Sequence, residues 1–241
     1  MGEPFVPSKT PPAAAGTAPV NVSNEWMVGY VPGVHAEYFD LNHKAAKLIP
    51  AGADLVFEMH YTPNGQAAAA DQTRIGLVLA KEPPQKRLLT VPVAELGFEI
   101  PPGAPNHEGR ASARFDKPVE LLYSQPHMHL RGKDMDIRLE YPTGESQMLV
   151  SVPRFDFNWQ LIYYQDQPLP LPKGTEVKLV AHWDNSANNR ANPDPKVAVR
   201  WGDQSWEEML FAWVGVIVDR DDTLETVMAV RRGNSANSSP R

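Results

Sequence analysis

The stretch VELLYSQPHMHLRGKDMDIRLE, residues 119–140, decides the fold class of this chain. Every second residue is apolar near both of its ends, at Val119, Leu121 and Tyr123 and again at Met135, Ile137 and Leu139. Side chains of a β-strand point alternately to the two faces of a sheet, so this period of two predicts strands that are buried on one face. The sequence YPTG at 141–144 then supplies the residues of a turn.

The same alternation recurs along most of the chain. It is found at residues 55–61, 75–79 and 177–183, and turn sequences with proline and glycine lie at 63–65, 101–103, 142–144 and 172–174. Short strands with regular turns predict an all-β fold, here a jelly-roll β-sandwich over residues 91–232 with a partial second β-sandwich over 23–90. Residues 1–22 and 233–241 have too little hydrophobic content to pack and are expected to be a flexible lead-in and a flexible tail.

Composition excludes several classes of protein. The 241 residues are 42% hydrophobic and 22% charged, as in an ordinary globular protein, and 24 prolines argue against long helices. A net charge of −6 without a basic cluster gives no basis for binding nucleic acid or an anionic membrane. The absence of cysteine excludes disulfides and thiolate metal ligands. The capping-box sequence from Ser205 to Glu208 is typical of the start of a short helix, whereas the alternating Met209, Phe211 and Trp213 that follow favour a strand.

Two histidines, His127 and His129, stand two residues apart in the stretch that decides the fold. On a strand, residues i and i+2 lie on the same face about 6–7 Å apart, so two imidazoles in this arrangement can converge on one metal ion. The alternative is a pair of unrelated structural histidines. Met209 could fill a core, yet a thioether is also a soft ligand that favours Cu(I) over Zn(II).

Three longer motifs resemble one family. HMHLRGK at 127–133, HWDNSANNRANPDP at 182–195 and VRWGDQSWEEM at 199–209 are similar to the C-terminal domain of copper type II, ascorbate-dependent monooxygenases, the family of dopamine β-monooxygenase and peptidylglycine α-hydroxylating monooxygenase. The resemblance implies a catalytic copper held by His127, His129 and Met209. It also implies hydroxylation of a C–H bond of a small-molecule substrate with O₂ and electrons from ascorbate or a similar donor.

The sequence before residue 90 resembles the end of the family's N-terminal copper domain. EMHY at 58–61 resembles the part of that domain that supplies one ligand of an electron-transfer copper, and this role falls on His60. The family's other two ligands form an adjacent His-His pair, which this chain lacks; His35 and His43 are the only upstream candidates. We therefore expect a partial site: either the chain is truncated and an upstream segment supplies the His-His pair, or it is a partner-dependent or degenerate member. We also expect a less ordered half before residue 90. The resemblance favours an extracytoplasmic location.

The resemblance also bears on the substrate. Peptide-hydroxylating members hold the peptide carboxylate with Arg, Asn and Tyr at positions that correspond to Gln125, Phe211 and Trp213. Without a guanidinium to pair with the carboxylate, glycine-extended peptides are expected to be poor substrates.

Two other interpretations remain open from the sequence. A cupin-like metalloprotein would combine His127 and His129 with Asp134 and His182 around zinc, iron or manganese. A β-sandwich that binds copper without catalysis would explain the missing electron-transfer ligands. Other polar residues are expected to be structural, with His107 and His182 supporting the fold and Asp184, Glu207 and Glu208 capping, bridging or facing solvent.

Overall fold

The structure, a computed structural model, describes residues 25–39, 44–61, 65–66, 70 and 72–228. The expected lead-in at 1–22 and tail at 233–241 lie outside the described residues. The elements are β1 (Ala45–Ala46), β2 (Lys86–Glu95), β3 (Glu99–Ile100), β4 (His107–Arg114), β5 (Val119–His127), β6 (Gly132–Glu140), β7 (Ser146–Val152), β8 (Tyr163–Leu171), β9 (Glu176–Trp183), β10 (Val199–Arg200), β11 (Leu210–Asp219) and α1 (Leu224–Val227).

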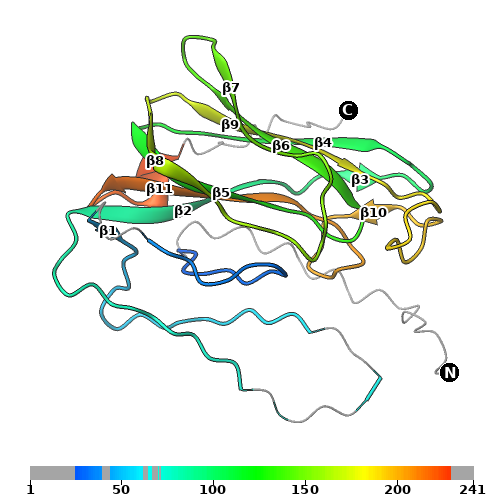
Figure 1. Cartoon of the computed structure of the whole chain (residues 1–241), viewed down its shortest axis with the longest axis horizontal. Helices are drawn as coiled ribbons and strands as arrows, with labels where there is room; N and C mark the ends of the chain where they lie inside the picture. Colours follow the sequence, from blue (N-terminus) through cyan, green and yellow to red (C-terminus); the bar gives the residue numbers. More distant parts are fainter. Residues whose placement is uncertain (1–24, 40–43, 62–64, 67–69, 71, 229–241) are drawn as a thin grey trace, which may run out of the picture.

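Two sheets face each other and form the predicted all-β sandwich (Figure 1). One sheet has the strand order β1-β2-β11-β5-β8 and the other β4-β9-β6-β7, while β3 and β10 form a two-stranded sheet of their own. The core between the sheets takes Val91, Leu121 and Val214 from the first sheet and Ile137 and Leu179 from the second. The strands predicted around residues 119–123, 135–139 and 177–183 are thereby confirmed as parts of β5, β6 and β9.

The outer face of the five-stranded sheet is also apolar, unlike the usual face that meets water. In β11 the residues Leu210, Ala212 and Val214 face the core. Phe211 and Trp213, which alternate with them, therefore face outward. Tyr123 packs over Gly215 on this outer face, where an added Cβ would lie 2.1 Å from the tyrosine ring. An apolar outer face requires a cover.

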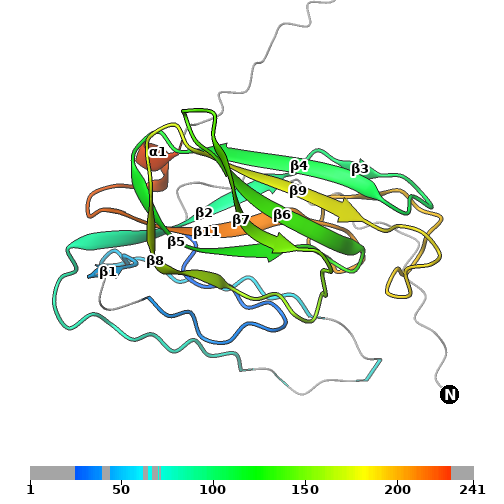
Figure 2. The same cartoon turned by 45° about the horizontal axis from the view of Figure 1, so that its top comes forward.

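Residues 25–39 and β1 provide this cover (Figure 2). The indole of Trp26 lies 5.4 Å from that of Trp213, measured between ring centroids, and Glu25 pairs with Arg87 at 2.5 Å. The backbone N–H of Gln160 donates to the carbonyl of Pro32 at 2.9 Å. The upstream segment is therefore packed onto the sandwich.

The upstream region differs from the prediction. Residues 55–61 and 75–79 form no strands, and their apolar side chains are exposed, with Val56 at 89% and Val78 at 98% of full exposure. Among the described residues before β2, the only strand is β1, which joins the main sheet, so no second sandwich forms there. The expected boundary between residues 90 and 91 falls inside β2. Alternation predicts which face a strand buries but cannot supply the partner strand that it needs.

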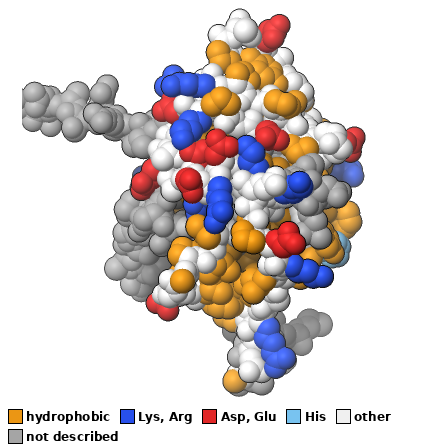
Figure 3. All heavy atoms as spheres, turned by 90° about the vertical axis from the view of Figure 1, so that its left-hand side faces the viewer, with side chains coloured by type: hydrophobic (Ala, Val, Ile, Leu, Met, Phe, Trp, Pro, Cys, Tyr) orange, Lys and Arg blue, Asp and Glu red, His pale blue; other side chains and the backbone are white. Residues whose placement is uncertain are grey.

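The helix expected at Ser205 is also absent. Residues 205–206 form a turn in which the Glu207 carboxylate accepts the backbone N–H of Gln204 at 3.0 Å, so the capping sequence closes a turn without starting a helix. A capping box is present instead at Thr223, before α1. No helix among the described residues is long and apolar enough to cross a membrane. On the face in Figure 3, Lys and Arg side chains are interspersed with Asp and Glu, without a large patch of one sign.

Candidate metal centre

The structure brings His127 and His129 together at the end of β5. His127 is its last residue and pairs with Phe211 of β11, while Met128 between the histidines points into the core. Both imidazoles are buried, and their ring centroids lie 5.1 Å apart at an interplanar angle of 79°. Two imidazoles that bind one ion through nitrogen bonds of about 2.0–2.1 Å at a near-tetrahedral angle have centroids roughly 5 Å apart. The observed separation therefore fits one shared ion.

Hydrogen bonds fix which nitrogen of each ring is available. Gln160 donates its amide N–H to the Phe157 carbonyl at 2.7 Å, so its Oε1 accepts from His127 Nδ1 at 2.6 Å. His129 Nδ1 donates to the carbonyl of Glu207 at 3.3 Å. In these tautomers each histidine carries its lone pair on Nε2, which is the arrangement usual for a metal-ligating histidine.

The surroundings keep both imidazoles neutral. Burial, followed by the proximity of His129, lowers the pKa of His127 to about 3. Burial likewise lowers the pKa of His129 to about 4, against hydrogen bonds to backbone carbonyls that act in the opposite direction. Because a metal ion binds the neutral imidazole, both side chains are in the ligand form at neutral pH.

Glu208 connects this pair to Met209. Its side chain is fully buried, and Oε2 accepts the backbone N–H of His129 at 2.9 Å and that of Met209 at 3.3 Å. Met209 directly precedes β11, and continuing the pairing of Phe211 with His127 by two residues places Met209 beside His129. The backbone positions of the three predicted ligands therefore lie at one end of the β5–β11 pair.

A buried arginine links the other sequence motifs to the same place. The guanidinium of Arg131 donates to Asn185 Oδ1 at 2.9 Å and to the Trp206 carbonyl at 2.7 Å. Asn189 donates to the carbonyl of Leu130 at 3.2 Å. Burial raises the pKa of Glu208 to about 7, although three backbone N–H groups and the charge of Arg131 act to lower it. The motifs at 127–133, 182–195 and 199–209 are thus parts of one polar network around His127, His129 and Met209.

Residues at the expected substrate positions lie next to His127. Trp213 stands 5.2 Å from the His127 ring and Phe211 stands 4.7 Å from Trp213, between centroids. The Gln125 amide donates to the carbonyl of Gln160 at 3.3 Å. The indole N–H of Trp213 is buried without a hydrogen-bond partner in the described part of the chain. This wall is aromatic and carries no positive charge.

His60 lies on the extended upstream segment and close enough to act electrostatically on the pair. After burial, its electrostatic interaction makes a smaller contribution to lowering the pKa of His127 and of His129. Its own ring is 45% exposed and its Nε2 lies 3.1 Å from Glu58 Oε1. His35 is exposed, and His43 lies outside the described residues. Within the described ranges no further ligand joins His60.

The cupin-like ligand set is not assembled. His182 Nδ1 lies 2.6 Å from Asp134 Oδ1, and both side chains are on the outer face of the four-stranded sheet, across the core from His127. No group of three or more His, Cys, Asp or Glu side chains suited to a metal is found among the described residues. His107 stacks on Trp183 with centroids 6.1 Å apart, a structural role as expected.

The expected structural carboxylates divide into two kinds. Asp184 and Glu207 cap turns, because they accept the backbone N–H groups of Ser186 and Gln204. Glu208 instead accepts the backbone N–H groups of His129 and Met209, a role that its sequence position beside Met209 did not reveal. Gln160 was missed entirely, because its partner His127 is 33 residues away and no motif marks it.

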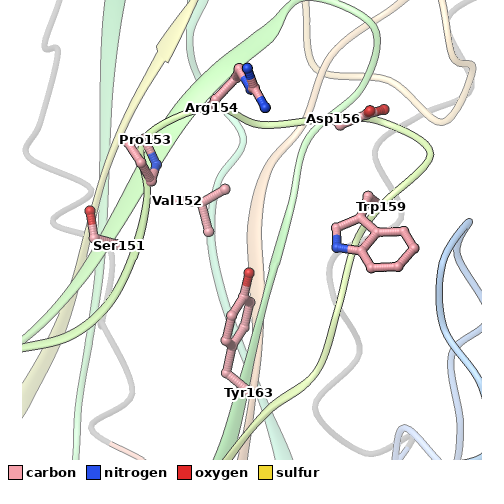
Figure 4. Close-up of a pocket in the computed structure, with 7 residues that line it drawn as sticks. All are labelled: Ser151, Val152, Pro153, Arg154, Asp156, Trp159 and Tyr163. Carbon is pink, nitrogen blue, oxygen red and sulfur yellow. The ribbon is translucent and has the colours of Figure 1, made fainter.

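The loop that carries Gln160 also borders a surface pocket of about 450 Å³ (Figure 4). The pocket is lined by Ser151, Val152, Pro153, Arg154, Asp156, Trp159 and Tyr163. Neither it nor a second pocket of about 410 Å³ beside Tyr141 includes the histidine pair or Met209. The candidate centre is therefore defined by its ligands and hydrogen bonds and by no enclosed cavity among the described pockets.

Comparison with family models and with curated proteins finds no match to this chain.

Proposed function

We propose that this chain is the copper-binding part of a monooxygenase that uses O₂ and an ascorbate-type reductant, with its catalytic copper held by His127, His129 and Met209. The observation that carries the proposal is the pair of buried, neutral imidazoles with ring centroids 5.1 Å apart and both Nδ1 atoms engaged in hydrogen bonds. Such a pair is prepared to bind one metal ion through its two Nε2 atoms.

The donor set fits copper. Two imidazoles alone suit zinc or copper, whereas a thioether beside them favours Cu(I). Copper bound there would supply one-electron redox chemistry and activation of O₂. The chain's own residues orient the ligands: Gln160 holds His127, the Glu207 carbonyl holds His129, and Phe211 and Trp213 exclude water from one side.

The substrate is a small molecule, and the surface that Gln125, Phe211 and Trp213 form beside His127 has no recognition site for a carboxylate. Gln125 is committed to the Gln160 carbonyl, and neither Phe211 nor Trp213 carries a positive charge that could pair with a carboxylate. Glycine-extended peptides are therefore expected to be poor substrates. Measurable hydroxylation of such a peptide would contradict this.

Electron supply requires more than this chain's described residues. His60 would contribute one ligand to an electron-transfer copper, and two further ligands would have to come from outside the described residues. A second candidate function, copper binding without catalysis, is favoured by the absence of partner ligands for His60 among the described residues. The family resemblance is a reason to expect an extracytoplasmic location for either protein.

X-ray absorption on the Cu(I)-loaded chain tests the donor set. We expect a copper–sulfur shell in the wild type that is lost in Met209→Ala and retained in Met148→Ala, a matched change at a more exposed methionine on β7. Absence of sulfur from the wild-type spectrum, or a preference for zinc, would count against the proposal. Reductant-dependent O₂ consumption that yields hydroxylated product separates the enzyme from a copper-binding sandwich.

A further inference from the structure

Glu208 makes an unusual set of contacts for a carboxylate. Its side chain is fully buried and accepts four N–H groups: those of His129 and Met209 and the Trp183 indole on Oε2, and that of Arg131 on Oε1 at 2.6 Å. A buried carboxylate is costly unless its oxygens are well satisfied by hydrogen bonds. Here the donors come from three segments that are far apart in the sequence.

We infer that Glu208 is a positioning residue that sets the sulfur of Met209 against the two imidazoles. This inference rests on the proposed copper site. Oε2 is shared by the backbone N–H groups of His129 and Met209, at 2.9 and 3.3 Å, so one atom fixes the separation of the two backbone points from which these side chains extend. The Trp183 indole at the end of β9 donates to the same atom at 3.0 Å and helps to satisfy the buried carboxylate.

The three ligands do not depend equally on Glu208. His127 is held by Gln160 through a hydrogen bond at its ring, and the ring of His129 is held by the Glu207 carbonyl. Met209 has no ring nitrogen to hold, and a methionine side chain has three flexible bonds. Its sulfur is therefore placed mainly through its backbone, which Glu208 fixes. Loss of the carboxylate should displace the sulfur and leave the imidazole pair.

The decisive variant is Glu208→Gln, which keeps the shape of the side chain but places an amide N–H₂ among four donors. In the Cu(I)-loaded protein we expect the copper–sulfur shell to weaken or disappear while the copper–nitrogen shell remains. Cu(I) affinity should fall by about 10–100-fold, the usual effect of removing a partner of a metal ligand. Zn(II) affinity, which does not rely on sulfur, should change much less.

Two controls separate positioning from general stability. Glu207→Gln changes the adjacent carboxylate, which accepts only the Gln204 N–H on the turn, and should retain the sulfur shell. Trp183→Phe removes one donor to Oε2 without touching either ligand backbone, and should lower the melting temperature while retaining the sulfur shell. If Trp183→Phe and Glu208→Gln lost the sulfur shell equally, a general loss of protein stability would explain the loss in Glu208→Gln. That result would overturn the inference.

A measurement on the wild type covers the case in which Glu208→Gln does not fold. The backbone amides of His129 and Met209 should exchange slowly with solvent in the metal-free protein, as hydrogen-bonded groups do. Rapid exchange of both would overturn the inference. A wild type without a copper–sulfur shell would overturn the proposed function and this inference with it. A sulfur shell present in both the wild type and a folded Glu208→Gln would overturn this inference alone.

Discussion

Replacement of Gln160 by leucine tests how the candidate centre is held. The Gln160 side chain is buried and makes two short bonds, from His127 Nδ1 at 2.6 Å and to the Phe157 carbonyl at 2.7 Å. Leucine fills the space but leaves the imidazole N–H and the carbonyl without partners. Each buried group left unsatisfied costs about 1–3 kcal/mol, so we expect the free energy of unfolding to fall by roughly 2–6 kcal/mol.

The same variant should weaken metal binding. The His127 ring loses the bond that fixes its orientation, and removal of such a partner lowers metal affinity by about 10–100-fold. The assay is competition for Cu(I) with a chromophoric chelator, together with chemical denaturation of the metal-free protein. Gln147→Leu, at an exposed glutamine that accepts only the Tyr141 hydroxyl, is the matched control. A Cu(I) affinity for Gln160→Leu equal to that of the control would refute the reasoning.

Three further predictions test the fold and the limits of the site. Gly215→Ala should destabilise by about 1–3 kcal/mol in urea denaturation, because its Cβ would lie 2.1 Å from the Tyr123 ring. Burial of Asp222 acts to raise its pKa, but hydrogen bonds, first from Lys117, outweigh this and lower the pKa. The resulting stability is present above the unfolded pKa of about 3.9 and is lost as the pH falls through the folded value. Asp222→Asn should therefore be less stable than the wild type at pH 7, by about 1 kcal/mol for a partly exposed pair, and the difference should vanish in acid. His182→Ala should leave Cu(I) affinity unchanged in the chelator assay, and a loss would revive a site that includes His182.

The sequence predicted strands well where one face is buried and failed where a partner strand was required. Residues 177–183 alternate and form β9, with Leu179 and Ala181 in the core. Residues 55–61 alternate equally clearly and form no strand, because hydrogen-bonded neighbours decide whether an alternating segment joins a sheet. Alternation is a property of one segment, whereas pairing is a property of two.

The candidate site was predictable to the extent that its residues are close in sequence. His127 and His129 are separated by two positions, and the structure brings their rings together. Met209 was predicted as the third copper ligand from the family resemblance alone. The partners that hold these residues, Gln160 and Glu208, lie 33 and 79 positions from the histidines that they contact, and glutamine and glutamate are ordinary surface residues in a sequence. Long-range hydrogen bonds of this kind leave no local pattern.

The placement of the histidines on the outer face of the five-stranded sheet has a consequence for evolution and engineering. His127 shares β5 with core residues such as Leu121. Its ring nevertheless lies on the opposite side of the sheet, because the strand has a β-bulge between Leu121 and Tyr123. Substitutions that repack the interior, for example at Val177 or Leu179, meet only the inner side. Thermal stability and the candidate metal centre can therefore be altered by separate sets of mutations, so a library confined to the interior can raise heat resistance without changing the histidine pair.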